Sequence, residues 1–90
     1  MEFEYDPAKS EGNKAKHGID FEDAQSLWHD VERLEAGILR PGEKRYLLIG
    51  RIDSIHWTAI ITYRGEVVRI ISVRRSRRDE VERYEKDRNI

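Results

Sequence analysis

Apolar and polar residues alternate with a period of two along the second half of the chain, which predicts consecutive β-strands. Three candidate strands cover residues 44–52, 56–64 and 66–74, and a tight turn at Arg64-Gly65 joins the last two. The segment "VERLEAGILRPGEK" is ambiguous: it allows a further strand around residues 31–35, followed by a loop with a turn signal at Pro41-Gly42. One face of the middle strand is expected to carry Trp57, Ala59, Ile61 and Tyr63.

The same alternation predicts the faces of the last strand. Val68, Ile70, Ser72 and Arg74 are expected on one face, and Val67, Arg69, Ile71 and Val73 on the other. Arg69 and Arg74 would then lie on opposite faces, and each would need solvent or a partner.

The first part of the chain predicts a short strand at residues 3–5 and two helices. Asp6 can cap the first helix, Pro7 suits its first turn, and Gly18 is the expected stop just after His17. Asp20 can cap the second helix, which carries an apolar stripe of Phe21, Ala24, Leu27 and Trp28.

A third helix is expected near the end of the sequence. Ser76 and Asp79 have the spacing of a capping box, with Asp in place of Glu, and Val81 and Tyr84 are the residues that this helix offers to the core. The sequence therefore predicts a single α+β domain over residues 1–90. Its small antiparallel sheet of three to four strands packs with two N-terminal helices and one C-terminal helix.

Composition limits the class of protein. The 90 residues include 38% apolar and 39% charged residues, so the core must be small and the faces sharply segregated. Cysteine is absent, which fits a reducing compartment, and no apolar run approaches the roughly 20 residues of a membrane span. The acidic N-terminal segment does not resemble a signal peptide. We expect a soluble cytoplasmic protein that does not interact with membranes.

The net charge of −1 conceals two halves of opposite sign. Residues 1–43 carry five Lys and Arg against eleven Asp and Glu, whereas residues 44–90 carry twelve against seven. Six arginines and one acid, Glu66, lie within residues 64–78. This basic stretch can attract phosphate groups or an acidic protein partner.

Motifs for metal, nucleotide and acyl-enzyme chemistry are missing from the sequence. His17, His29 and His56 are far apart, and neither a P-loop, a dinucleotide fingerprint nor a G-x-S-x-G elbow is present. We therefore expect no metal and no cofactor.

The remaining signal is a group of cations with a few proton carriers. Metal-free RNA cleavage needs a base for the 2′-OH, an acid for the leaving 5′-oxygen and positive charge at the phosphate. Arginine suits the phosphate, His17 can act as base or acid near neutral pH, and Tyr84, Tyr63 and Glu43 are alternative proton carriers. Lys9, Asn13 and Lys16 share a polar face of the first helix.

Each of these residues also has a structural interpretation. The lysines form an ordinary solvated helix face, His17 favours the C-terminal end of a helix dipole, and the last arginines pair with nearby acids. A phosphate site requires the first helix and the strand-end arginines to meet in a common pocket. The residues alone predict an anion-binding α+β domain and no more specific activity.

Three segments resemble the BrnT toxins. "DPAKSEGNKAKHGIDFEDA" has their D-x-x-K-x-x-x-N-x-x-K-H-G-x-x-F-x-x-A spacing, and "GEKRYLLIG" is similar to their E-x-R segment. "RIISVRRSRRDEVERYE" is similar to their R-I-I-S-A-R-R-A stretch with a downstream E-x-x-x-Y. The order of the segments is the same along nearly the whole chain. Val73 and Ser76 stand where alanine is usual.

The resemblance implies a type II toxin with a fold like that of the RelE toxins, which cleaves RNA without a metal and arrests growth. It implies neutralisation in a hetero-oligomer with a cognate antitoxin that carries a ribbon-helix-helix region, through which the pair contacts operator DNA. Carried over residue by residue, with Arg64 added from its place at the turn, the expected catalytic residues are His17, Arg64, Arg74, Arg75 and Tyr84. The expected RNA-binding residues are Lys9, Asn13, Lys16, Arg45, Arg69 and Ser72, and Glu43 belongs to the matched segment.

Two other functions remain open at the level of sequence. The chain could be a noncatalytic module that docks an antitoxin, or a nucleic-acid-binding regulator without enzymatic activity. Growth arrest with loss of cellular RNA on expression of the chain alone distinguishes the enzyme from the module.

Overall fold

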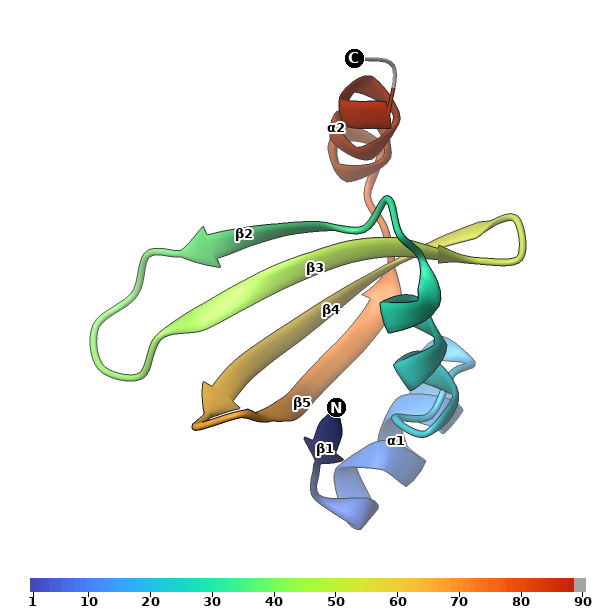
Figure 1. Ribbon diagram of the computed structural model, residues 1–90. Helices are drawn as coiled ribbons and strands as arrows, with labels where there is room; N and C mark the ends of the chain where they lie inside the picture. Colours follow the sequence, from blue (N-terminus) through green and yellow to red (C-terminus); the bar gives the residue numbers. More distant parts are fainter. Residues whose placement is uncertain (89–90) are drawn as a thin grey trace.

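Five strands form one sheet in the order β1-β5-β4-β3-β2 in the computed structural model, which describes residues 1–88 (Figure 1). In chain order the elements are β1 (Glu2–Glu4), α1 (Pro7–His17), η1 (Asp23–His29), β2 (Leu34–Ile38), β3 (Arg45–Ile52), β4 (Ile55–Arg64), β5 (Val67–Arg75) and α2 (Arg78–Arg88). No helix in this part of the chain is long and apolar enough to cross a membrane.

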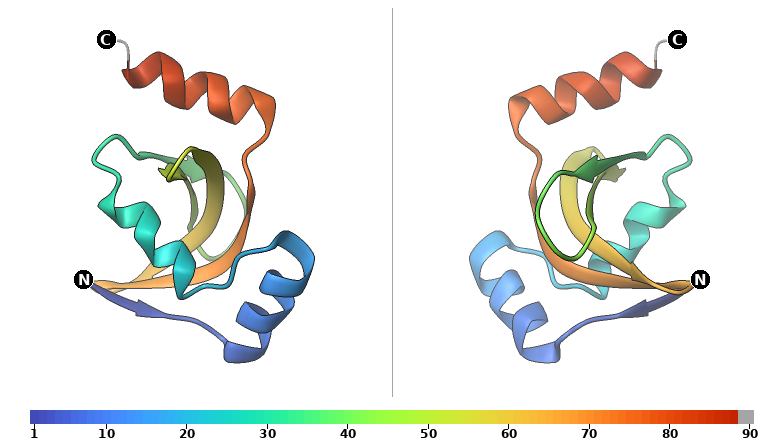
Figure 2. Two further views of the ribbon diagram at one scale, coloured as in Figure 1. Left: turned by 90° about the vertical axis from the view of Figure 1, so that its right-hand side faces the viewer. Right: turned by 90° about the vertical axis from the view of Figure 1, so that its left-hand side faces the viewer.

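Helices lie on both sides of the sheet. α1 and α2 are on opposite sides of the strands in each view, and η1 runs beside β3 (Figures 1 and 2). The core lies between the sheet and the N-terminal elements, and we call this side of the sheet the core face. Its buried side chains are Ile19, Phe21, Ala24, Leu27, Leu48, Trp57, Ala59, Ile61, Val68, Ile70 and Val73.

The first helix forms as its sequence predicts. The Asp6 carboxylate accepts a hydrogen bond from the Ala8 backbone N–H at 2.9 Å, and Pro7 occupies the first turn. Gly18 takes the left-handed conformation at φ 85°, and its N–H donates to the Lys14 carbonyl at 3.0 Å. This end suits glycine because an added Cβ is unfavourable at positive φ.

The sheet differs from the expected one in its number of strands and their directions. It has five strands, and β1 pairs parallel with β5, whereas the other pairs are antiparallel. A three-residue strand carries too little pattern to specify its partner. Its place at the edge is supported by Phe3, whose ring packs edge-on against Trp28 with centroids 4.8 Å apart.

The second helix and the strand after it are also shifted from their predicted positions. The helix is a 3₁₀ helix over Asp23–His29, although its stripe of Phe21, Ala24 and Leu27 is buried as expected. The following strand begins at Leu34 instead of residue 31. The reason is a turn at Asp30, whose side chain accepts from the Glu32 N–H and whose carbonyl accepts from the Arg33 N–H.

A β-bulge corrects the predicted faces of β5. Ile60 pairs with Ser72 and Ile61 pairs with Ile70, so Ile71 is the extra residue. Beyond the bulge the alternation changes phase, and Val73 therefore joins Val68 and Ile70 on the core face. Ser72 and Arg74 consequently lie on the same face as Arg69, and the prediction of opposite faces for the two arginines is wrong.

The start of the last helix needs a further correction. Glu80, not Asp79, supplies the carboxylate of the capping box, and its Oε1 accepts from the Arg77 N–H at 2.7 Å. The helix begins at Arg78, two residues after the Ser76 of the predicted cap. Tyr84 is buried, as expected for its place on this helix.

Candidate anion-binding site on the second face of the sheet

The face of the sheet opposite the core carries polar and cationic side chains in rows, and we call it the second face. One row pairs Thr62 with Arg69. Arg45, the first residue of β3, lies beside this pair, as the hydrogen bond from the Thr62 hydroxyl to the Lys44 carbonyl at 2.7 Å shows. The next row holds Leu47, Ile60 and Ser72, and the third holds Ile49, Thr58 and Arg74. The middle row is half-buried, whereas Ile49 and Thr58 are buried. α2 covers the end of the second face that carries Thr58, whereas at the other end Thr62 is buried and Arg45 and Arg69 are half-buried.

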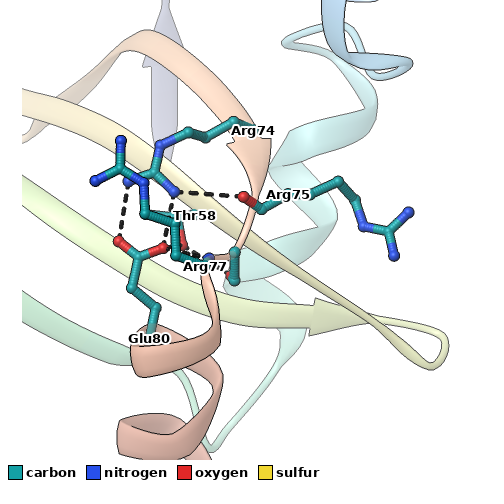
Figure 3. A network of polar contacts seen from close by, with 6 residues as sticks. Thr58, Arg74, Arg75, Arg77 and Glu80 are labelled. Carbon is teal, nitrogen blue, oxygen red and sulfur yellow. Dashed lines mark hydrogen bonds and ion pairs between the residues drawn. The ribbon is translucent and has the colours of Figure 1, made fainter.

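Arg74 and Glu80 form the tightest ion pair at the covered end. The two terminal nitrogens of Arg74 contact the two carboxylate oxygens of Glu80 at 2.7 and 2.9 Å (Figure 3). The same carboxylate accepts from the Thr58 hydroxyl at 3.0 Å and from the Arg77 N–H. Thr58 also contacts Ser76 through their hydroxyl oxygens at 2.8 Å. These contacts hold the first turn of α2 on β4 and β5.

The electrostatics of this pair follow from its contacts. Burial alone would raise the pKa of Glu80, but hydrogen bonds from Arg74, Arg77 and Thr58 lower it to about 2. The hydrogen bond to Glu80 raises the pKa of Arg74 further above its ordinary value. Three of the five N–H donors of Arg74 are used, two by Glu80 and one by the Arg75 carbonyl at 3.3 Å. Two donors remain for a ligand.

Arg75 lies on the other side of the strand from Arg74. Its guanidinium carbon is 5.6 Å from the centre of the Trp57 ring, in a cation–π contact, and its side chain points away from Glu80 (Figure 3). Arg74 and Arg75, two of the expected catalytic residues, therefore lie on opposite sides of β5.

Arg64 and Arg69 share the carboxylate of Glu4, which comes from the edge strand β1. The two contacts measure 3.7 and 3.4 Å, and the Glu4 side chain is 37% exposed. Such long, accessible ion pairs contribute little to stability. A phosphate could therefore displace Glu4 at small cost.

A second group of proton carriers, which the sequence did not predict, lies at the end of the second face that α2 covers. Nε2 of His56 is 3.0 Å from Oε2 of Glu85, and the ring packs edge-on against Tyr84 with centroids 5.2 Å apart. When Nε2 carries a proton and donates to Glu85, Nδ1 is a free base. The signal that could have found this pair is the position of His56 on the same strand face as Thr58, opposite the start of the last helix.

The predicted proton carrier Tyr84 is committed to the fold. Its side chain is 1% exposed, and its hydroxyl donates to Oδ2 of Asp30 at 2.6 Å. Burial would raise the pKa of Asp30, but the hydrogen bonds from Tyr84 and from the backbone of Arg51 and Glu32 outweigh it and lower the pKa. The contact anchors α2 to the turn before β2.

Asn13 is likewise occupied by the backbone. Its side-chain nitrogen donates to the carbonyls of Ile19 and Val73 at 2.8 and 2.9 Å, and its oxygen accepts from the Val73 N–H at 3.2 Å. The residue is 8% exposed and links α1 to β5. This arrangement gives Asn13 a structural role and leaves its amide without a free donor or an accessible surface for RNA.

The first helix and Arg74 do not form a common pocket. α1 docks at the edge of β5, where the Asn13 amide bonds the backbone N–H and carbonyl of Val73, whereas the Arg74 side chain belongs to the second face and contacts Glu80 of α2. Lys9 and Lys16 are exposed and His17 is half-buried at the end of α1. No hydrogen bond or ion pair within residues 1–88 joins these predicted residues to Arg45, Arg69, Ser72 or Arg74, which share the second face.

Two comparisons with known proteins bear on this site. The family model described as "Ribonuclease toxin, BrnT, of type II toxin-antitoxin system" matches residues 5–80. No curated protein matches the chain. The matched range includes the strands of the second face and ends at Glu80.

Proposed function

The chain belongs to the BrnT family of ribonuclease toxins from type II toxin–antitoxin systems, and on this premise we propose that it is a metal-independent endoribonuclease whose substrate lies on the second face. The family match over residues 5–80 carries the proposal. The second face supports it, because three arginines and one serine share this face and are only half-buried: Arg45, Arg69, Arg74 and Ser72.

Arg74 is the proposed ligand of the scissile phosphate, and Arg69 is the proposed ligand of another backbone phosphate, because their partners Thr58 and Thr62 lie four residues apart along β4. Arg69 exchanges its weak contact with Glu4 for a phosphate oxygen, and Arg74 offers its two remaining N–H donors while Glu80 fixes the plane of the guanidinium. A planar, permanently charged group held in place is suited to the charge that grows on the phosphate in the transition state. Ser72 lies between them on the same strand face and contributes a hydroxyl.

His56 is the proposed proton carrier, held by Glu85. Its Nδ1 takes the proton of the ribose 2′-OH, and the 2′-oxygen then attacks the adjacent phosphorus. The bond from phosphorus to the 5′-oxygen breaks, and that oxygen leaves with a proton from water or from the imidazolium. The products are a 2′,3′-cyclic phosphate and a 5′-hydroxyl end.

His17, Arg64, Arg75, Lys9 and Lys16 fall outside the second face or at its rim. We assign the two lysines and Arg75 to the general positive field that attracts RNA, since all three are exposed. Arg64 shares Glu4 with Arg69 at the end of β4 and assists in the same exchange.

A toxin of this class requires an antitoxin, and we propose one with a ribbon-helix-helix region that carries the pair to operator DNA. A basic antitoxin segment suits the acidic half of the chain, whose balance over residues 1–43 is −6. Growth arrest by the free chain in the cytoplasm, relieved by this partner, is the expected biological result.

The direct test is digestion of RNA by the purified protein in excess chelator, followed by analysis of the product ends. Cyclic phosphate and 5′-hydroxyl ends support the proposal. Cleavage that stops on chelation and returns with a divalent cation contradicts metal independence. If the RNA stays intact while the protein still binds its antitoxin, the result favours the noncatalytic docking module. If the isolated chain binds duplex DNA, the result favours the nucleic-acid-binding regulator.

A further inference from the structure

A second cationic site lies at the hairpin between β2 and β3, beyond the row of Arg45 and Arg69. The hairpin borders a half-open hollow of about 460 Å³, a size within the usual range for small-ligand pockets. Arg40, Lys44 and Arg45 contribute to its wall together with Gly42 and Tyr46, and no carboxylate lines it.

The three cations of the hollow have no carboxylate partner in the described part of the chain. Glu43, their neighbour in sequence, is exposed and does not line the hollow. Glu35 on the adjoining strand is engaged elsewhere, because it accepts the Tyr63 hydroxyl at 2.6 Å. Positive charge in the hollow is therefore uncompensated by the protein.

Arg45 supplies an independent observation. Its Nε is buried and lacks a hydrogen-bond partner, although the side chain as a whole is only half-buried. A buried donor without a partner is rare in folded proteins because it loses its hydrogen bond to water. In this conformation Nε is closed to solvent, so a ligand oxygen reaches it only after the guanidinium turns toward the hollow. The guanidinium fork of arginine matches the oxygens of a phosphate.

We propose that this hollow holds a nucleotide of the RNA substrate away from the scissile bond, with its phosphate on Arg40, Lys44 and Arg45. The inference rests on the proposed function. Thr62, beside Arg45, is four residues along β4 from Thr58, beside Arg74, which corresponds to about 14 Å at about 3.4 Å per residue. A single RNA strand can therefore extend along the second face from Arg74 into the hollow.

The test measures binding of a short 2′-O-methylated RNA, which lacks the attacking hydroxyl and stays intact. Arg40→Gln combined with Lys44→Gln removes two cations from the hollow. Arg83→Gln combined with Lys86→Gln removes the same charge from exposed positions on α2 and is the matched control. We expect the hollow variant to bind about tenfold more weakly and to lose about 1.4 from the salt slope, since each single-strand phosphate contact contributes about 0.7. The control should stay near wild type.

Two further measurements separate the possible outcomes. On cleavable RNA the hollow variant should show a raised KM with kcat retained, because contacts remote from the reaction affect binding. Arg45→Lys keeps the charge but removes Nε, and weaker binding by this variant supports the role of that donor. Equal binding by the hollow variant and its control, with wild-type cleavage intact, overturns the subsite alone, and absence of RNA binding by the wild type overturns the proposed function too. If the hollow variant loses affinity for polyglutamate while its affinity for RNA is unchanged, the hollow binds an acidic protein. This result also overturns the proposal.

Discussion

The carboxylate of Glu80 accepts two hydrogen bonds from the guanidinium of Arg74, at 2.7 and 2.9 Å, across the junction of β5 and α2. The Glu80 side chain is 9% exposed and the Arg74 side chain 21%. This one contact both attaches the last helix to the sheet and sets the orientation of an arginine on the second face. The stability of the helix and the geometry of the proposed site are therefore coupled.

Glu80→Gln should lower the free energy of unfolding by about 2–3 kcal/mol, because it weakens a charge-assisted pair and leaves the buried part of Arg74 without a counter-charge. Urea unfolding measures the loss. Glu82→Gln is the matched control, since Glu82 forms an exposed pair with Arg78 at 3.3 Å and should change stability by less than about 0.5 kcal/mol. Equal effects of the two variants would contradict a structural role for Glu80.

Acid should destabilise the protein in the range set by Glu80. Its pKa is about 2 in the folded chain against an ordinary value of 4.5, so the unfolded state binds more protons between these pH values. Its contribution is present above about pH 4.5 and is lost as the pH falls toward 2. Asp30, whose pKa is also lowered, adds to the loss below its ordinary value of 3.8. Unfolding free energies across pH 2–6 should show a smaller slope for Glu80→Gln than for wild type.

Asn13→Ala should destabilise the fold by about 2–4 kcal/mol, because it removes three buried hydrogen bonds and leaves the Val73 N–H and two carbonyls unpaired. Lys16→Ala, on the exposed side of the same helix, should change stability little. Thermal unfolding compares the two variants. A stable Asn13→Ala protein with weakened RNA binding would restore the RNA-contacting role that the sequence motif suggests.

Arg69→Gln and Arg75→Gln test which face of β5 meets RNA. Both variants remove one charge from the same strand, but Arg69 belongs to the second face and Arg75 packs over Trp57. We expect Arg69→Gln to reduce the salt slope of RNA binding by about 0.7, and Arg75→Gln to leave it nearly unchanged. The reverse result would move the site to the side of α1.

His56→Gln should lower the rate of RNA cleavage by about 100-fold or more, the usual contribution of a positioned proton carrier. RNA binding should remain, since the imidazole is not a proposed phosphate ligand. His17→Gln is the matched control and should cleave at nearly the wild-type rate. Single-turnover kinetics at several pH values measure both. A strong effect of His17→Gln with an active His56→Gln enzyme would overturn the assignment.

Local signals predicted the parts of the fold that depend on a few neighbouring residues. Asp6, Pro7 and Gly18 define α1 because capping and left-handed backbone are decided within one helical turn. The long strands of the second half follow from their alternation. The bulge at Ile71 could not be predicted, because an extra residue in a strand leaves no sign in the alternation before it.

The candidate site shows the same division. Its residue types could be predicted from the sequence, which places several arginines and Ser72 near the end of one strand and Arg45 after the turn. Their grouping did not, because the phase change at Ile71 brings Arg69 and Arg74 to one face and leaves Arg75 on the other. His56 and Glu80 gained their roles from α2 docking across the strand ends.

By itself, the sequence determined the class of this protein: an α+β domain with a cap-defined first helix, a run of strands, and a concentration of arginine that suits a phosphate backbone. Tertiary structure alone decided which cations act together and which side chains serve the fold, as with Asn13 and Tyr84. The physical reason is the separation along the chain of the residues that set each property. Caps, periods and net charge are properties of adjacent residues, whereas the face, burial and partner of a charged group depend on segments that meet only when the chain has folded.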